Sequence, residues 1–150
     1  MTAKYTSQTP FTASYMLFKN TAGKFAFLLR SNTTWMNGYY TFPSGKVENG
    51  EFYTDCAIRE SKEEVGASIL PKDLRTVLTM HRIEVDSTWV DVYLEVLSWE
   101  GELYNAEPDI HGGLVWFSPD ELPDNIVPNV RHALEQIATG NTYCEFKGEN

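Results

Sequence analysis

The stretch "GKVENGEFYTDCAIRESKEEVGA", residues 45–67, gathers carboxylates in an unusual way. Its charged residues of interest are Glu51, Arg59, Glu60, Glu63 and Glu64. The residue content of 52–65 predicts a helix, and at about 100° per residue Glu60, Glu63 and Glu64 share one arc of it. The same arc holds Phe52, Tyr53, Cys56 and Ala57. The carboxylates therefore continue the apolar face of the helix, whereas an ordinary amphipathic helix places them opposite it.

Carboxylates that face protein repel one another and are costly to bury without compensation. A hard divalent cation with oxygen ligands would supply that compensation. The alternative is a solvated acidic patch, and the helical projection alone leaves both open. The loop between Gly45 and Gly50 favours the metal, since a tight glycine loop can bring carbonyls beside a cation and amides beside phosphate. Arg59 keeps its charge and can hold a carboxylate in a fixed orientation.

Working outward, alternation and turn residues predict strands at 12–20, 24–31, 40–42, 74–85, 88–99 and 114–118. The first two are expected to pair around a turn at 20–23. The stretch Ser118 to Glu121 has the pattern of a helix start with a capping box. A second helix is expected to begin at Pro128 and to end at Gly140. Strands dominate the first two thirds of the chain, with one central helix and one C-terminal helix. This order indicates a mixed α/β sandwich in one domain spanning 1–150.

The net charge limits the classes of partner. The chain has 150 residues and a net charge of −9, with 12 basic against 21 acidic side chains. Proteins that bind polymeric nucleic acid need surplus lysine and arginine, so we expect no such partner. An acidic protein can still bind an anionic small molecule when a metal cation supplies positive charge.

The cysteines and the apolar residues bear on location. Cys56 and Cys144 are the only cysteines, and we expect two free thiols in a reducing compartment. The three histidines do not have zinc-site spacing relative to them. There is neither a signal-peptide pattern nor an apolar run long enough to cross a membrane, so the expected location is the cytoplasm, with no membrane partner.

The spacing of the opening stretch resembles the Nudix box. The box has the order glycine, five residues, glutamate, seven residues, Arg-Glu, two residues, Glu-Glu, one residue and glycine. In this chain these positions are held by Gly45, Glu51, Arg59, Glu60, Glu63, Glu64 and Gly66. Two apolar positions of the box hold the small residues Ser61 and Ala67. The similarity to MutT-like Nudix hydrolases extends from about Phe11 to Ile137. It implies the Nudix α/β/α sandwich, a mixed sheet with the box helix and a C-terminal helix, whose core covers about 11–138.

The resemblance also implies roles for individual residues. Nudix enzymes hydrolyse nucleoside diphosphates linked to another moiety, with Mg²⁺ or Mn²⁺ as cofactor. The implied metal ligands are Gly45, Glu51, Glu60, Glu63 and Glu64, with Glu51 either in direct contact or through water. Arg59 would fix the glutamate geometry. The general base is a box glutamate or a distal one, for which Glu107 in "NAEPDI" is the candidate and Glu102 the alternative; an ordinary exposed loop acid is the competing interpretation of Glu107.

Substrate contacts are expected from Arg30 to phosphate and from Trp35 and Tyr40 by stacking on a base. His81 or its neighbour Arg82, on the strand after the box helix, is a further candidate. Each has a competing structural role, as a solvated edge residue, as packing or as an ordinary strand histidine. Outside the box, the proline typical of ADP-ribose hydrolases and the motif of the NADH class are both absent. Elimination therefore favours (deoxy)nucleoside triphosphates, sometimes oxidised, cleaved to monophosphate and pyrophosphate.

Alternatives stay open at this stage. ADP-ribose or another nucleotide sugar is the second substrate class. A non-catalytic nucleotide sensor would be expected to have lost a box glutamate, and this chain keeps all of them. A calcium loop and a G-x-S-x-G nucleophile motif are absent from the sequence. Many members of the family are dimers, so a homodimer is compatible with the sequence, although no interface is identified.

Overall fold

The computed structural model describes residues 9–149 and contains two sheets and two α-helices. The five-stranded sheet has the order β4-β1-β6-β5-β8, and the three-stranded sheet has the order β3-β2-β7. The strands are β1 (Phe11–Phe18), β2 (Phe25–Arg30), β3 (Tyr40–Thr41), β4 (Ser44–Lys46), β5 (Leu74–Ile83), β6 (Thr88–Val96), β7 (His111–Phe117) and β8 (Tyr143–Lys147). The helices are α1 (Tyr53–Val65), α2 (Pro128–Ala138) and a 3₁₀ turn, η1 (Pro71–Asp73).

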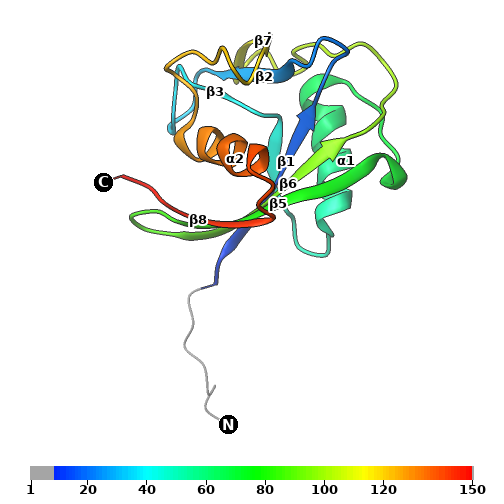
Figure 1. The fold of residues 1–150 in the computed structure, drawn as a ribbon. Helices are drawn as coiled ribbons and strands as arrows, with labels where there is room; N and C mark the ends of the chain where they lie inside the picture. The colour runs from blue at the N-terminus through cyan, green and yellow to red at the C-terminus, as the bar shows by residue number, and fades with distance from the viewer. Residues whose placement is uncertain (1–8, 150) are drawn as a thin grey trace.

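The larger sheet is mixed and is covered on both faces. Strand β1 runs parallel to β6 and antiparallel to β4, while β5 is antiparallel to β6 and parallel to β8. Figure 1 shows α1 and α2 on opposite sides of this sheet, with the β3-β2-β7 sheet across one end. The expected α/β sandwich with one helix from the 52–65 region and one beginning at Pro128 is therefore confirmed.

Alternation along the central strands divides the core into two parts. From β1, Tyr15 and Leu17 pack in the cluster that α2 completes with Val130 and Leu134. Their neighbours Met16 and Phe18 pack on the other face, in the cluster that α1 completes with Ala57 and Val65. Because successive side chains of a strand point to opposite faces, a strand covered on both faces is buried along consecutive residues and is mostly apolar. This explains why six consecutive residues of β1 are buried, and it fixes α1 against the sheet. The one polar residue of this run, Ser14, donates a hydrogen bond to Tyr53 O.

The predicted pairing of the first two strands is wrong. Strands β1 and β2 share only the bridge between Lys19 and Phe25 and then enter different sheets. The turn itself forms as expected, with Asn20 Oδ1 accepting hydrogen bonds from the N–H groups of Ala22 and Lys24. Both edges of β1 are taken by β4 and β6, so β2 pairs instead with β3 and β7.

Three further elements differ from expectation. Residues 118–121 form a turn, in which Glu121 N–H donates to Ser118 O at 3.0 Å, and not a helix start. Pro123 follows at once and disfavours helical backbone at Leu122, which explains the early stop. Strands β4 and β8 were not predicted, because segments this short carry little alternation. Phe52, expected on the apolar face of the helix, precedes it as the N-cap and is 79% exposed.

A buried ion pair lies on the face of the larger sheet that α2 covers. Arg82 on β5 donates to both carboxylate oxygens of Asp91 on β6, at 2.5 and 3.2 Å, and both residues are buried. Burial raises the pKa of Asp91, because desolvation outweighs the attraction of the guanidinium. Within residues 9–149, no helix has the length and apolar character needed to cross a membrane.

Candidate active site

Strand β4 brings the glycine loop against α1. A Cβ atom added at Gly45 would lie 2.1 Å from the carboxyl carbon of Glu60, so a larger residue here would displace that carboxylate. The carbonyl of Gly45 accepts a hydrogen bond from the thiol of Cys56 at 3.4 Å. The box therefore folds so that its first glycine contacts one of its glutamates, fifteen positions along the chain.

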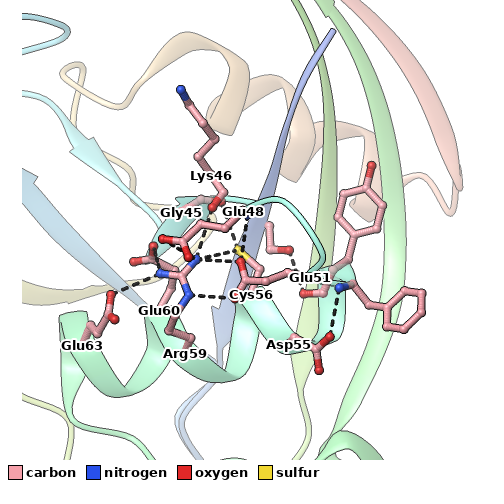
Figure 2. Close-up of polar contacts among 12 residues, drawn as sticks. Gly45, Lys46, Glu48, Glu51, Asp55, Cys56, Arg59, Glu60 and Glu63 are labelled. Carbon is pink, nitrogen blue, oxygen red and sulfur yellow. Dashed lines mark hydrogen bonds and ion pairs between the residues drawn. The ribbon is translucent and has the colours of Figure 1, made fainter. Parts of the chain in front are cut away.

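Arg59 organises three of the carboxylates (Figure 2). Its Nε and Nη2 donate to the two carboxylate oxygens of Glu51 at 2.8 and 2.9 Å, a bidentate pair. Its Nη1 donates to Glu60 at 2.7 Å and to Glu63 at 3.3 Å. The side chain of Glu60 is 14% exposed and that of Glu63 is 51% exposed, so the guanidinium joins a half-buried carboxylate to an exposed one.

The arginine affects these carboxyl groups unequally. Hydrogen bonds from Arg59 lower the pKa of Glu51 to about 2, so Glu51 stays charged and fixed. Burial raises the pKa of Glu60, and this effect outweighs the hydrogen bond that Arg59 donates to it. The charges of Glu63 and Glu107 raise the pKa of Glu60 further. Glu51 is therefore already neutralised by the protein, whereas Glu60 still lacks full compensation.

Glu64 accepts none of the hydrogen bonds that Arg59 donates to the other box glutamates, and it is buried, at 8% exposure. Its Oε2 accepts a hydrogen bond from the backbone N–H of Ser44 at 2.9 Å. Burial raises the pKa of Glu64 well above its ordinary value, and the charges of Glu60 and Glu107 raise it further. Among the described residues, no basic side chain forms a salt bridge with Glu64.

The loop before β7 brings Glu107 to the box helix. The N–H groups of Tyr104 and Ala106 donate to the last carbonyls of α1, those of Val65 and Glu64, at 3.2 and 3.0 Å. These bonds place the loop over the end of the helix. Desolvation raises the pKa of Glu107, and the charge of Glu63 adds to that shift. The distal glutamate thus lies within electrostatic reach of the box, while Glu102 is exposed.

His111 joins this cluster and was not predicted from the sequence. Ligand atoms of Glu64, Glu107 and His111 all lie within 4.8 Å of one another. His111 N–H donates to Glu107 O at 3.0 Å, so the two residues span one turn of backbone. The spacing of four residues between the acid and the histidine was the available signal, but it has meaning only once that turn is known.

The donor set fits a hard divalent cation. Glu60, Glu64 and Glu107 have raised pKa values through burial and mutual repulsion, which is the condition that a bound cation would relieve. The Nδ1 atom of His111 is buried without a hydrogen-bond partner and can accept a metal. The interior of the candidate metal site is therefore formed by Glu60, Glu64, Glu107 and His111, and not by the exposed end of the acidic helix.

A cavity of about 620 Å³ adjoins the box. Its wall includes Ser44 and Gly45 from β4, Tyr15 from β1, and Arg82 and Trp89 from the β5–β6 hairpin. The guanidinium of Arg82 lies 4.8 Å from the centre of the Trp89 ring. The volume lies in the range of small-molecule sites, roughly 300–1,000 Å³.

The predicted substrate residues divide into two pairs. Arg30 and Trp35 line the cavity, and the Arg30 guanidinium lies 5.0 Å from the Trp35 ring centre. Tyr40 and His81 are not among the lining residues. Tyr40 packs edge-on against Phe117 at 4.9 Å, and His81 lies within β5, paired with β6 and β8. Arg82, considered beside His81 as a substrate contact, lines the cavity, whereas Trp89 was not predicted from the sequence.

Comparison with curated proteins identifies distant relatives. The chain is 29% identical over 107 residues to the uncharacterized Nudix hydrolase YvcI of Bacillus subtilis strain 168, covering 69% of this chain and 66% of that protein. It is 33% identical over 104 residues to a candidate 8-oxo-dGTP diphosphatase of Mycobacterium tuberculosis strain H37Rv, covering 66% of this chain and 47% of that protein. The chain thus spans about half to two thirds of the length of these relatives.

Solved structures and a family model agree with the fold. A MutT Nudix hydrolase from Burkholderia pseudomallei superposes with a TM-score of 0.77 at 26% identity, over 86% of this chain and 98% of that one. A MutT protein from Bacillus halodurans has a TM-score of 0.74 at 18% identity, over 91% and 89% of the two chains, and shows the same fold. The predicted Nudix sandwich is therefore confirmed. Since the family model described as the NUDIX domain matches residues 9–137, the chain belongs to the Nudix hydrolase family.

Proposed function

We propose that the chain is a metal-dependent pyrophosphohydrolase that cleaves (deoxy)nucleoside triphosphates, oxidised ones included, to the monophosphate and pyrophosphate. The observation that carries this proposal is that strand β4 borders both the cavity and the carboxylates. Ser44 and Gly45 line the cavity, while Ser44 N–H binds Glu64 and Gly45 contacts Glu60. A nucleotide whose phosphates reach the carboxylates would therefore place its base and sugar in the cavity.

The lining of the cavity supports a nucleotide. Trp35 and Trp89 offer aromatic faces on which a base can stack. Arg30 and Lys46 supply positive charge for phosphate oxygens on the same wall. The relative from Mycobacterium tuberculosis, described as a candidate 8-oxo-dGTP diphosphatase, favours oxidised purine nucleotides as the first substrates to test.

The carboxylates are proposed to hold Mg²⁺ or Mn²⁺. Glu60, Glu64 and Glu107 would be direct ligands, and the predictions of Gly45 and Glu63 as further ligands are retained. Such an ion, when bound, would neutralise phosphate charge and ease the deprotonation of a water molecule. Glu51 is fully engaged by Arg59, so its proposed role is to hold that arginine, and through it Glu60, in place.

Glu107 is the proposed general base. Its carboxylate has two oxygens, so one can bind the ion while the other accepts a proton from a water molecule. The loop that carries it is tied to the end of α1 by backbone hydrogen bonds from Tyr104 and Ala106. Its carboxylate can therefore stay in register with the box glutamates while a substrate enters.

A hydrolysis panel tests the proposal. Canonical dNTPs, 8-oxo-dGTP, ADP-ribose, NADH and a dinucleoside polyphosphate are incubated with Mg²⁺ or Mn²⁺, and products are separated by chromatography. Monophosphate plus pyrophosphate from one triphosphate is the expected result. Cleavage of ADP-ribose alone would replace the substrate class, and tight metal-dependent binding without cleavage of any compound would indicate a nucleotide sensor.

A matched pair of variants ties the activity to the site. Glu60→Gln should lower turnover by at least about 100-fold, more than the 10–100-fold typical of losing a residue that only supports a ligand. Glu135→Gln makes the same change at an exposed position of α2 and should leave turnover unchanged. Equal activity of the two variants would contradict the assignment of the box as the catalytic site.

A further inference from the structure

The three-residue cluster of Glu64, Glu107 and His111 differs from the rest of the carboxylate site because it includes a nitrogen donor. One ring nitrogen of His111 and one carboxylate oxygen of each glutamate lie within 4.8 Å of one another. An ion bound at about 2.1 Å to each ligand holds neighbouring ligand atoms about 3 to 4 Å apart. Small side-chain rotations are therefore sufficient to close these three atoms around one ion.

The histidine is buried and its Nδ1 atom lacks a partner. His111 is 4% exposed, and its Nδ1 has no hydrogen-bond partner among residues 9–149. A buried polar atom without a partner carries the full cost of its desolvation. Between residues 9 and 149, the other such side-chain atom is Ser61 Oγ on the box helix. Of these two residues, only His111 belongs to a cluster of ligand groups.

The backbone holds this imidazole in place. His111 begins β7, where it pairs with Arg30 of β2, and its N–H donates to Glu107 O. Its carbonyl accepts a hydrogen bond from Asn105 Nδ2 at 2.8 Å. The turn from Glu107 to His111 is thus closed by main-chain and side-chain bonds, so the two side chains are preorganised as a pair.

The charges around the imidazole also favour a cation. The charged groups that face it are Arg30, Glu64 and Glu107; the two carboxylates attract a cation and Arg30 opposes it in part.

We propose that His111 is a nitrogen ligand to a divalent metal ion shared with Glu64 and Glu107, and that this nitrogen makes the site prefer a first-row transition metal ion such as Mn²⁺ over Mg²⁺. Mg²⁺ takes oxygen ligands and gives up water reluctantly, whereas first-row transition ions accept imidazole readily. The inference rests on the proposed function only in that both require a divalent ion at this site.

Electron paramagnetic resonance of bound Mn²⁺ tests the ligand directly, in the full chain after removal of metal. The pulsed spectrum should show ¹⁴N coupling that changes to ¹⁵N coupling when the protein is grown with ¹⁵N-histidine. His111→Asn should abolish that coupling. His132→Asn is the matched control, because His132 packs on Phe146 with ring centres 5.5 Å apart and should keep it.

Titration with MnCl₂ and MgCl₂ tests the preference. The wild type should bind Mn²⁺ at least about tenfold more tightly than Mg²⁺, and His111→Asn should lose most of that ratio. Absence of histidine coupling in the wild type, or an unchanged ratio in His111→Asn, would overturn the proposal. The labelled wild-type spectrum decides the matter even if the variant does not fold. Hydrolysis with Mg²⁺ but no nitrogen coupling would refute this inference and leave the proposed function standing.

Discussion

Replacing Glu64 by glutamine should stabilise the metal-free protein while removing its response to metal. Glu64 is buried, and its pKa is raised well above the ordinary value by desolvation and by neighbouring carboxylates. Glutamine keeps an oxygen that can accept the Ser44 N–H. Its NH₂ group would face the oxygen of Glu107 and the nitrogen of His111, both of which are acceptors. The variant thus exchanges repulsion for hydrogen bonds.

The expected change in the free energy of unfolding has two opposing parts, a gain without metal and a loss of stabilisation by metal. Removing a strained functional group commonly adds about 0.5–2 kcal/mol to the free energy of unfolding. At about 2–4 °C per kcal/mol for a chain of this length, the metal-free variant should melt about 1–8 °C above the wild type. Metal at 100 times its dissociation constant should stabilise the wild type by about 2.7 kcal/mol, and the variant should lose most of that gain.

The effect should depend on pH. A carboxyl group whose pKa is raised on folding favours the folded state most when it is protonated, so its contribution is complete below the ordinary pKa of 4.5 and is lost as pH rises through the folded pKa. The wild type should therefore lose this contribution as pH rises above 4.5 and through the raised pKa of Glu64, and the glutamine variant should not. The stability difference between the two proteins should grow with pH.

Urea unfolding with EDTA, repeated across this pH range and then with Mn²⁺, measures both terms. Glu135→Gln is the control, because it makes the same change at an exposed helix position. The reasoning is refuted if the metal-free Glu64→Gln protein is less stable than the wild type at pH 8, or if Mn²⁺ stabilises both proteins equally.

Other consequences follow from the packing. Asp91→Ala removes the buried partner of the Arg82 guanidinium, which keeps only its ion pair with Glu84, and should cost about 3–5 kcal/mol in urea unfolding. Glu95→Gln, in the more exposed ion pair with Arg75, should cost less than about 1 kcal/mol. Ser61→Ala removes a buried hydroxyl that has no hydrogen-bond partner and should raise the free energy of unfolding by about 1 kcal/mol, measured in the same titration. Gly45→Ala places a methyl group where a box carboxylate lies and should lower turnover by about 100-fold with unchanged circular dichroism. Gly113→Ala, whose added carbon meets nothing within 4 Å, should leave turnover unchanged.

The box helix could be predicted from the sequence because its determinants are local. Its caps and its helical spacing lie within a single stretch, and the structure places α1 within one residue of the expected start. The helical projection grouped Glu60, Glu63 and Glu64 on one arc, but packing divides that arc. Glu64 is buried under β4 and the distal loop, while Glu63 is half exposed beside Arg59. The width of the arc could not show which glutamate faces the interior.

The missed elements depend on contacts between distant parts of the chain. Strand β8 forms because α2 returns the chain to the free edge of β5, so its pairing is decided by topology rather than by alternation. The local hairpin signal between residues 12 and 31 was overridden because β6, far along the sequence, occupies the edge of β1. His111 and Trp89 reach the site by the same kind of long-range pairing, and no motif marks them.

Glu64 is the residue at which local and distant determinants meet. Its carboxylate accepts the N–H of Ser44 and so fixes the glycine loop against the cavity. Its backbone carbonyl accepts the N–H of Ala106 and so fixes the loop that carries Glu107 and His111. One helix position therefore sets the distance between the cavity wall and the distal ligands. A change that shifts α1 along the sheet would move both together, whereas a change in the carboxylate alone would release only the glycine loop, because the bond to Ala106 uses the main chain.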